Sequence, residues 1–218
     1  MSTKFVISKG TAVQTDFRNE VLRNAVSILK RDIGTTVTGN GPKNTITLTL
    51  NDHGNGDSDE YAVKLIDSEH VEVTADTELG VMYGALAISR TVLGVDNFWF
   101  WLDTKTPKHA TIEWSDFDSL KMADYHVKYR GWFVNDELLF NNWQYRESGE
   151  YVWKLIFETL LRCGGNVVIP GTDKNSHSNR TLAAAMGLTI AHHHAEPLGG
   201  GNVLAGIPRF GSIVFEIS

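Results

Sequence analysis

The sequence predicts an α/β protein in which a small N-terminal α+β domain precedes the first strands and helices of a truncated (β/α)8 barrel. Three observations lead to this prediction. Residues 129–197 alternate strand-like apolar runs with helical patterns, the order typical of a parallel sheet with crossover helices. A polar cluster follows each strand-like run, where such sheets present their chemistry. The chain of 218 residues ends soon after the third cluster.

Residues 1–120 hold the elements of the predicted first domain. Apolar or alternating runs predict strands at 5–7, 45–50, 61–66 and 70–74. Helical spacing of apolar residues predicts a helix from Phe17 to Arg31, with Asp16 as its N-cap and Gly34 just past its end. A second helix is predicted from Thr77 to Leu93. Two helices and a small mixed sheet form an α+β layer.

Residues 94–127 form the predicted connector, and the aromatic run 98–101 is its most distinctive part. Adjacent residues of an extended chain point to opposite faces, so the four rings cannot share one surface. One interpretation is that some of these rings pack at the junction between two domains. The alternative is a platform on which a sugar stacks, because aromatic faces suit pyranose rings.

Residues 121–218 form the predicted second domain, the start of the barrel. Its strands are predicted at 129–134, 166–170 and 188–191, and its helices at 150–162 and 179–186. Glycines at 164, 165 and 187 lie where these helices should end. The single cysteine, Cys163, falls within the first helical pattern and is predicted to be a plain buried thiol.

The polar clusters at the strand ends supply the candidate site. The first is 135–137 (Asn-Asp-Glu), the second is the run 172–177, which contains Asp173, and the third is 192–196 (His-His-His-Ala-Glu). Carboxylates in such places serve as general acids and bases, while amides and imidazoles can hydrogen-bond a polyol. The alternative for the first cluster is a polar loop whose Asp or Glu caps the next helix, and for the second an ordinary solvated loop. The third could instead hold structural histidines or bind a metal ion.

Composition and charge indicate which classes of partner the chain is expected to bind. The net charge of −6 and the lack of a basic run exclude an electrostatic footprint for nucleic acid. No stretch reaches the roughly 18 apolar residues of a membrane span. The N-terminal apolar run is too short for a signal peptide, so a cytoplasmic location is expected for the chain as written. A trimmed form of an extracellular parent protein would have the same features. No metal or cofactor is expected, because neither a zinc-type nor a calcium-loop spacing is present.

Six segments of the chain carry a resemblance to a known family. They are 80–90, 98–103, 128–137, 157–166, 182–188 and 193–197. Together they resemble glycoside hydrolase family 115, the xylan α-1,2-glucuronidases, over residues 61–199. The most specific parts run from Arg130 to Glu137 and from His193 to Pro197.

The resemblance implies removal of glucuronic acid, or its 4-O-methyl ether, from xylan with inversion. Such a mechanism needs two carboxyl groups about 6.5–9.5 Å apart, one as the acid and one to activate water. The catalytic candidates are Asp136, Glu137 and Glu196. The expected partner is glucuronoxylan or its oligosaccharides. The expected substrate-binding residues are Asn135, Asp136, Glu137, Asp173, His193, His194 and Glu196.

Members of this family continue for several hundred residues, and a complete barrel takes about 250. The resemblance therefore implies an incomplete barrel with little activity of its own. An open three-stranded sheet exposes an edge and an apolar face, which predicts low stability or self-association through the open barrel edge. Two other hypotheses stay open. One is a non-catalytic module that binds an acidic sugar, and the other is part of another barrel glycosidase, such as a β-hexosaminidase or a family 67 glucuronidase.

Overall fold

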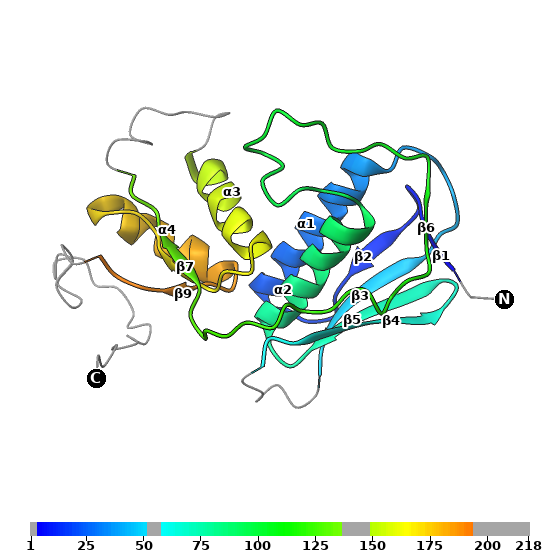
Figure 1. Ribbon diagram of the computed structural model, residues 1–218, viewed down its shortest axis with the longest axis horizontal. Helices are drawn as coiled ribbons and strands as arrows, with labels where there is room; N and C mark the ends of the chain where they lie inside the picture. Colours follow the sequence, from blue (N-terminus) through cyan, green and yellow to red (C-terminus); the bar gives the residue numbers. More distant parts are fainter. Residues whose placement is uncertain (1–3, 52–57, 137–148, 194–218) are drawn as a thin grey trace.

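The computed structural model describes residues 4–51, 58–136 and 149–193, and it shows a mixed α/β fold. The larger sheet lies on the right of Figure 1, helices α1 and α2 cross the centre, and a smaller parallel sheet lies on the left. Within the described residues, no helix is both long enough and apolar enough to cross a bilayer.

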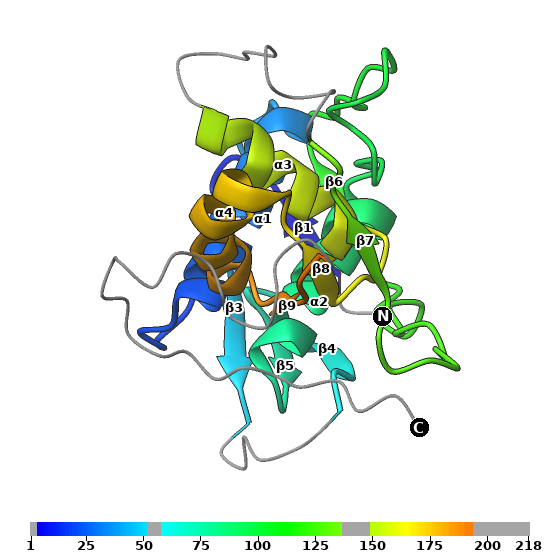
Figure 2. The same ribbon diagram turned by 90° about the vertical axis from the view of Figure 1, so that its left-hand side faces the viewer.

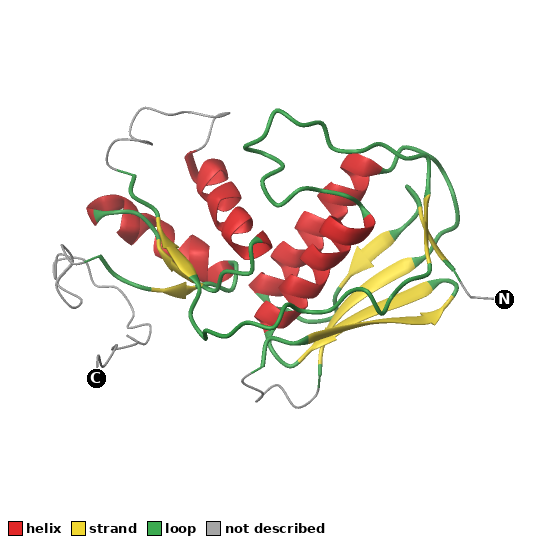
Figure 3. Cartoon of the chain, in the orientation of Figure 1, coloured by secondary structure: helices red, strands yellow, loops and turns green. Residues whose placement is uncertain are grey.

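The first unit is a four-stranded mixed sheet with two helices packed on one face (Figure 3). Its strand order is β2–β3–β5–β4, in which only β4 runs antiparallel to its neighbour. Every second side chain of the central strands is buried, as the alternating sequence predicts. The elements are β2 (Ala12–Gln14), α1 (Glu20–Thr36), β3 (Thr45–Leu50), β4 (Tyr61–Asp67), β5 (His70–Ala75), α2 (Glu78–Ala87) and the π-helix η1 (Ile88–Val92), besides an antiparallel ribbon of β1 (Phe5–Ile7) and β6 (Ile112–Trp114).

Helix α1 begins and ends later than the sequence pattern predicts. Its N-cap is Asn19 rather than Asp16, because the Asn19 side chain accepts hydrogen bonds from the backbone N–H groups of Val21 and Leu22. At the other end, the helix continues through Gly34 to Thr36. Gly34 is therefore a helix-interior residue, and the prediction that it terminates the helix is wrong. Strands β2 and β6 are not among the strands that the sequence pattern predicts.

The position of Gly34 gives a testable prediction. We expect Gly34→Ala to raise the free energy of unfolding by about 0.5–1 kcal/mol, because glycine is costly inside a helix. A Cβ added there would meet no atom within 4 Å. Gly164→Ala is the contrasting control, since Gly164 has φ +79° and an added Cβ would lie 1.9 Å from the Tyr125 hydroxyl oxygen. Urea denaturation should show opposite shifts, and a lower midpoint for Gly34→Ala would contradict the assignment.

The second unit is a three-stranded parallel sheet of order β7–β8–β9. The predicted alternation of strands and helices is present, with α3 and α4 as the crossovers packed against each other (Figure 2). The elements are β7 (Gly131–Phe133), α3 (Gly149–Arg162), β8 (Val167–Ile169), α4 (Asp173–Ala185) and β9 (Thr189–Ile190).

Two local predictions in this unit are wrong. Helix α4 begins at Asp173 rather than at Asn179, so the polar run 172–177 is the first part of a helix instead of a loop. Cys163 is exposed rather than buried, because it follows the last residue of α3 at the point where Gly164 turns the chain with φ +79°. Burial of neighbouring atoms still raises the pKa of the Cys163 thiol, which disfavours the thiolate.

The two units share one continuous hydrophobic core. Fully buried side chains from α1, α2, α3 and β8 belong to a single cluster, which includes Leu22, Met82, Phe157 and Val168. Helix α3 contacts α2, and α4 contacts α1, so the second unit is packed on the helical layer of the first (Figure 1). This packing fixes the direction in which the parallel strands, and hence their carboxyl ends, point.

Candidate functional site

The carboxyl ends of the three parallel strands lie at one edge of the small sheet and carry the predicted polar residues. Asn135, which is exposed, and Asp136, which is buried, follow β7, while His192 and His193 follow β9. The backbone of Asp173 begins α4 directly after β8. Glu137, His194 and Glu196 lie outside the described residues, as does the side chain of Asp173.

A ring stack joins the first and third strand ends. Phe133, the last residue of β7, stacks on His193 with ring centroids 4.6 Å apart and an interplanar angle of 18°. Strands β7 and β9 are the outer strands, so this pair reaches across the end of β8. The members of the first and third clusters that the structure describes therefore lie on one rim. Phe133 is 39% exposed, which leaves aromatic surface beside the polar groups.

Asp136 connects the end of β7 to the start of α4. Its side chain is 0% exposed and accepts hydrogen bonds from the backbone N–H of Thr172 at 2.9 Å and from the Thr172 hydroxyl at 3.0 Å. The amide of Asn175 donates to its other oxygen. Thr172 is the N-cap of α4 and makes no capping bond with its own side chain, and the carboxylate of Asp136 holds Thr172 and Asn175 at the start of the helix from a different strand.

Gly171 makes this close approach possible. It has φ +103°, and a Cβ there would lie 3.0 Å from Trp153 and 3.3 Å from the carboxyl carbon of Asp136. The sequence predicts a polar cluster at 172–177 but does not show that Gly171 brings β7 and α4 together. The signal was the Gly-Thr pair before an acidic helix start, which is a common N-terminal pattern.

The described residues of this rim suit a hydroxylated ligand. Asn135 offers an exposed amide, His193 offers ring nitrogens, and the Phe133–His193 stack offers an aromatic face, which together match the donors, acceptors and apolar faces of a sugar. Among the residues that the structure describes, no three His, Cys, Asp or Glu side chains gather closely enough to hold a metal ion.

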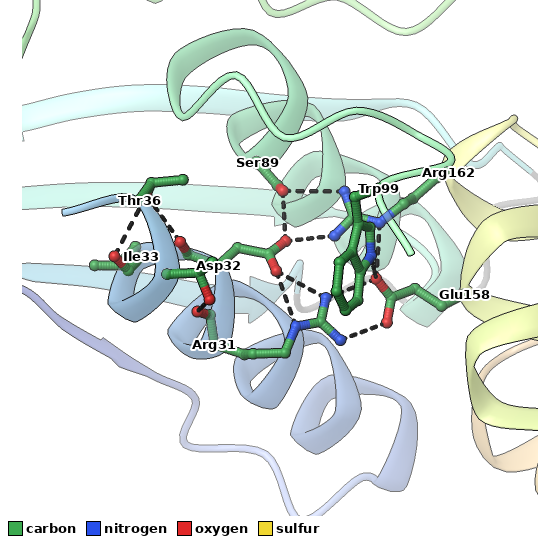
Figure 4. Close-up of polar contacts among 9 residues, drawn as sticks. Arg31, Asp32, Ile33, Thr36, Ser89, Trp99, Glu158 and Arg162 are labelled. Atoms are coloured by element: carbon green, nitrogen blue, oxygen red, sulfur yellow. Dashed lines mark hydrogen bonds and ion pairs between the residues drawn. The ribbon is translucent and has the colours of Figure 1, made fainter. Parts of the chain in front are cut away.

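A buried polar network, absent from the sequence analysis, lies between the two units (Figure 4). Glu158 of α3 accepts hydrogen bonds from both terminal nitrogens of Arg31 at 2.7 Å and from Nε of Arg162 at 2.8 Å. Asp32 of α1 accepts from Arg31 at 2.7 Å, from the Ser89 hydroxyl at 2.5 Å and from Arg162. The side chains of Asp32, Glu158 and Arg162 are only 3%, 4% and 0% exposed.

The charges of this network are mutually stabilised. Burial by itself raises the pKa of Glu158, but the hydrogen bond from Arg31 and the positive charge of Arg162 outweigh it and hold the pKa below its ordinary value. For Arg31, burial lowers the pKa, while the bonds to Glu158 and Asp32 raise it further than burial lowers it. The only sequence signal was the i,i+4 pair of Glu158 and Arg162 on the inward face of a predicted helix.

The aromatic run of the connector lies at this junction, as the first interpretation predicts. The indole N–H of Trp99 donates to Glu158 at 2.9 Å, and the Arg31 guanidinium lies 4.5 Å from the centre of the Trp99 ring. The indole N–H of Trp101 donates to the Thr159 hydroxyl at 2.8 Å. Both tryptophans therefore join the connector to α3 by side-chain hydrogen bonds.

Residues 122–204 match the family model described as glycosyl hydrolase family 115. Among solved structures, the chain is similar to a family GH115 4-O-methyl-α-glucuronidase, BtGH115A, whose title gives specificity for decorated arabinogalactans. The identity is 25% and the TM-score 0.68, and the match covers 87% of this chain and 30% of that one.

More distant structural matches are a GH20 exo-β-N-acetylglucosaminidase from Vibrio harveyi and a GH138 enzyme that targets pectin rhamnogalacturonan II. The first has 17% identity and a TM-score of 0.43 over 76% of this chain and 22% of that one. The second has 13% identity and the same TM-score of 0.43 over 72% and 23%. No curated protein matches the chain.

The described strand-end residues lie inside the region that matches a glycoside hydrolase family model. The match to the model of glycosyl hydrolase family 115 and the similarity to BtGH115A agree with the resemblance that the motifs carry. The chain spans about a third of the length of the glucuronidase structure that it matches.

Proposed function

We propose that the chain is the leading part of an α-glucuronidase-like glycoside hydrolase and that it binds an acidic sugar at the carboxyl ends of β7, β8 and β9. The observation that supports this most directly is the single rim formed by Asn135 and the Phe133–His193 stack inside the region matching the family model. A glucuronic acid side group on xylan or on another plant glycan is the ligand that the family match favours.

The same reasoning extends to the fold. We assign β7, β8 and β9 as the first three strands of a (β/α)8 barrel, with residues 1–120 as the leading domain and 121–218 as the start of the barrel. The parallel order β7–β8–β9 and the two crossover helices support this assignment. Among the described strands, β7 and β9 are the edges of this sheet, and self-association through these edges is part of the proposal.

The site residues take different roles in this proposal. Asn135 and His193 meet the hydroxyl and carboxylate groups of the sugar, together with Asp173 and His194. Of the catalytic candidates, Asp136 fits a positioning role, because its buried carboxylate already accepts hydrogen bonds from Thr172 and Asn175. Glu137 and Glu196 remain the candidates for general acid or base, and an inverting reaction needs two such groups.

Calorimetry with an aldouronic acid tests the binding function. We expect the acidic oligosaccharide to bind the 218-residue chain more tightly than the neutral xylo-oligosaccharide of the same length. Asn135→Ala and His193→Ala should each weaken this binding about tenfold, the loss of one or two hydrogen bonds. His126→Ala, an exposed histidine of the connector, is the matched control and should bind normally.

Product analysis separates the binding and enzymatic forms of the proposal. Because at least one carboxyl group of an inverting pair is expected on later strands, the chain should release little or no glucuronic acid from glucuronoxylan. Release of the sugar at a rate that Asn135→Ala abolishes would show a complete catalytic site and overturn that expectation. Equal affinity for acidic and neutral oligosaccharides would overturn the assignment of an acidic sugar.

A further inference from the structure

The connector passes beside α2 (Figure 1), and residues of both, together with the end of α3, line a pocket at the opposite end of the parallel sheet from the rim. Its lining includes Gly164, which precedes β8, and Tyr125, which precedes β7, so it faces the amino ends of the strands. The pocket has a volume of about 60 Å³. This volume holds one compact polar group of a ligand, and the rest of the ligand would lie at the mouth of the pocket.

The charged side chains that line this pocket are all positive. Arg90, Lys121 and Arg162 line it, and no carboxylate does. The charge of Arg162 is balanced by Asp32 and Glu158, but Arg90 and Lys121 are exposed and form no ion pair with any described residue. The chain as a whole has a net charge of −6, so these two cations at one pocket run against its overall charge. This local positive charge favours an anionic occupant.

Three tyrosines line the pocket beside these cations, and contacts hold two of them, Tyr83 and Tyr125, in place. The Tyr83 hydroxyl donates to the carbonyl of Gly165 at 2.8 Å, which fixes that ring. Tyr125 is held between Gly164 and the Arg130 guanidinium, which lies 3.9 Å from the ring centre. Burial raises the pKa values of Tyr61 and Tyr83, so both hydroxyls stay protonated and add no negative charge. Leu86, Met122 and Leu161 complete an apolar floor.

We infer that this pocket is a second ligand site, which binds the carboxylate of a small sugar acid between Arg90 and Lys121. Two exposed cations recognise the carboxylate, and the rings of Tyr61 and Tyr125 offer apolar faces to the sugar ring. The choice of a sugar acid over other carboxylates rests on the proposed function, whereas the anion site itself rests on the charges and walls of the pocket. The site is separate from the rim that carries Asn135 and His193.

An NMR titration of the full chain with D-glucuronate, and with D-glucose as the uncharged counterpart, tests the inference. D-Glucuronate should shift the amide signals of Tyr125 and Gly164 and bind at least ten times more tightly than D-glucose. Its affinity should fall as the salt concentration rises. The double variant Arg90→Gln/Lys121→Gln should lose this response. Lys9→Gln, which removes an exposed cation remote from the pocket, should retain it.

Two results would overturn the inference. One is an equal response to D-glucose, and the other is unchanged D-glucuronate binding in the double variant. Asn135→Ala distinguishes a failure of the rim proposal from a failure of the pocket proposal. It removes the rim contact and should leave the shifts at Tyr125 and Gly164 unchanged. If those shifts vanish in Asn135→Ala, the pocket is not an independent site.

Discussion

Glu158→Ala is expected to lower the free energy of unfolding by about 3–5 kcal/mol, the usual cost of removing one member of a buried ion pair. The substitution leaves Arg162 buried with only Asp32 as a counter-charge and removes the acceptor of both terminal nitrogens of Arg31. The Trp99 indole loses its acceptor as well. Because these partners come from both units, the loss should appear in one cooperative unfolding transition measured with urea.

Glu150→Ala on the same helix is the matched control. Glu150 pairs with Lys154 at 2.8 Å, but its side chain is 62% exposed, so the change should be worth less than about 1 kcal/mol. A similar loss in Glu158→Ala and Glu150→Ala would show that the buried network contributes little. Two separate unfolding transitions in the unmodified chain would show that the units are not joined as the structure has them.

Acid should weaken the same network. The folded-state pKa of Glu158 is lowered, so its contribution is fully present above the unfolded-state value of about 4.3. That contribution is lost as the pH falls through the lowered folded-state pKa. The unmodified chain should therefore lose more stability between pH 7 and pH 3 than Glu158→Gln does, and parallel losses would contradict this.

Asp136→Asn should have the next largest effect, a loss of about 2–3 kcal/mol in the free energy of unfolding. The asparagine keeps one acceptor oxygen but turns an amide group toward donors from Thr172 and Asn175. It also removes the negative charge at the N-terminus of α4. Chemical denaturation followed by circular dichroism measures the loss.

Asn135→Ala separates a positioning role from a binding role at the same strand end. Asn135 is exposed, so its removal should leave stability within about 0.5 kcal/mol while weakening binding of the acidic sugar. Asp136→Asn should instead lower the free energy of unfolding. Its folded molecules should still bind the acidic sugar when binding is measured at denaturant concentrations below the unfolding midpoint. Equal stability losses in both variants would contradict the positioning role.

Several parts of this protein follow from the sequence because they depend on local patterns. Alternating apolar residues in β3 and β5, and helical spacing in α1, specify which face of each element is buried before any partner is known. The order of strands and crossover helices after residue 128 likewise predicts parallel neighbours. The polar residues that directly follow those strands then have to lie at one edge.

Other parts required the tertiary structure, because they depend on contacts between residues far apart in the chain. Neither Asp136 nor Thr172 carries a local sign that a carboxylate after β7 accepts hydrogen bonds at the start of α4, and α4 begins earlier than its own pattern predicts. The pairing of Asp32 with Arg162 joins helices separated by most of the chain. A buried charge can be tolerated only where its partners arrive from other elements, and the packing of those elements, rather than the local sequence, decides where that happens.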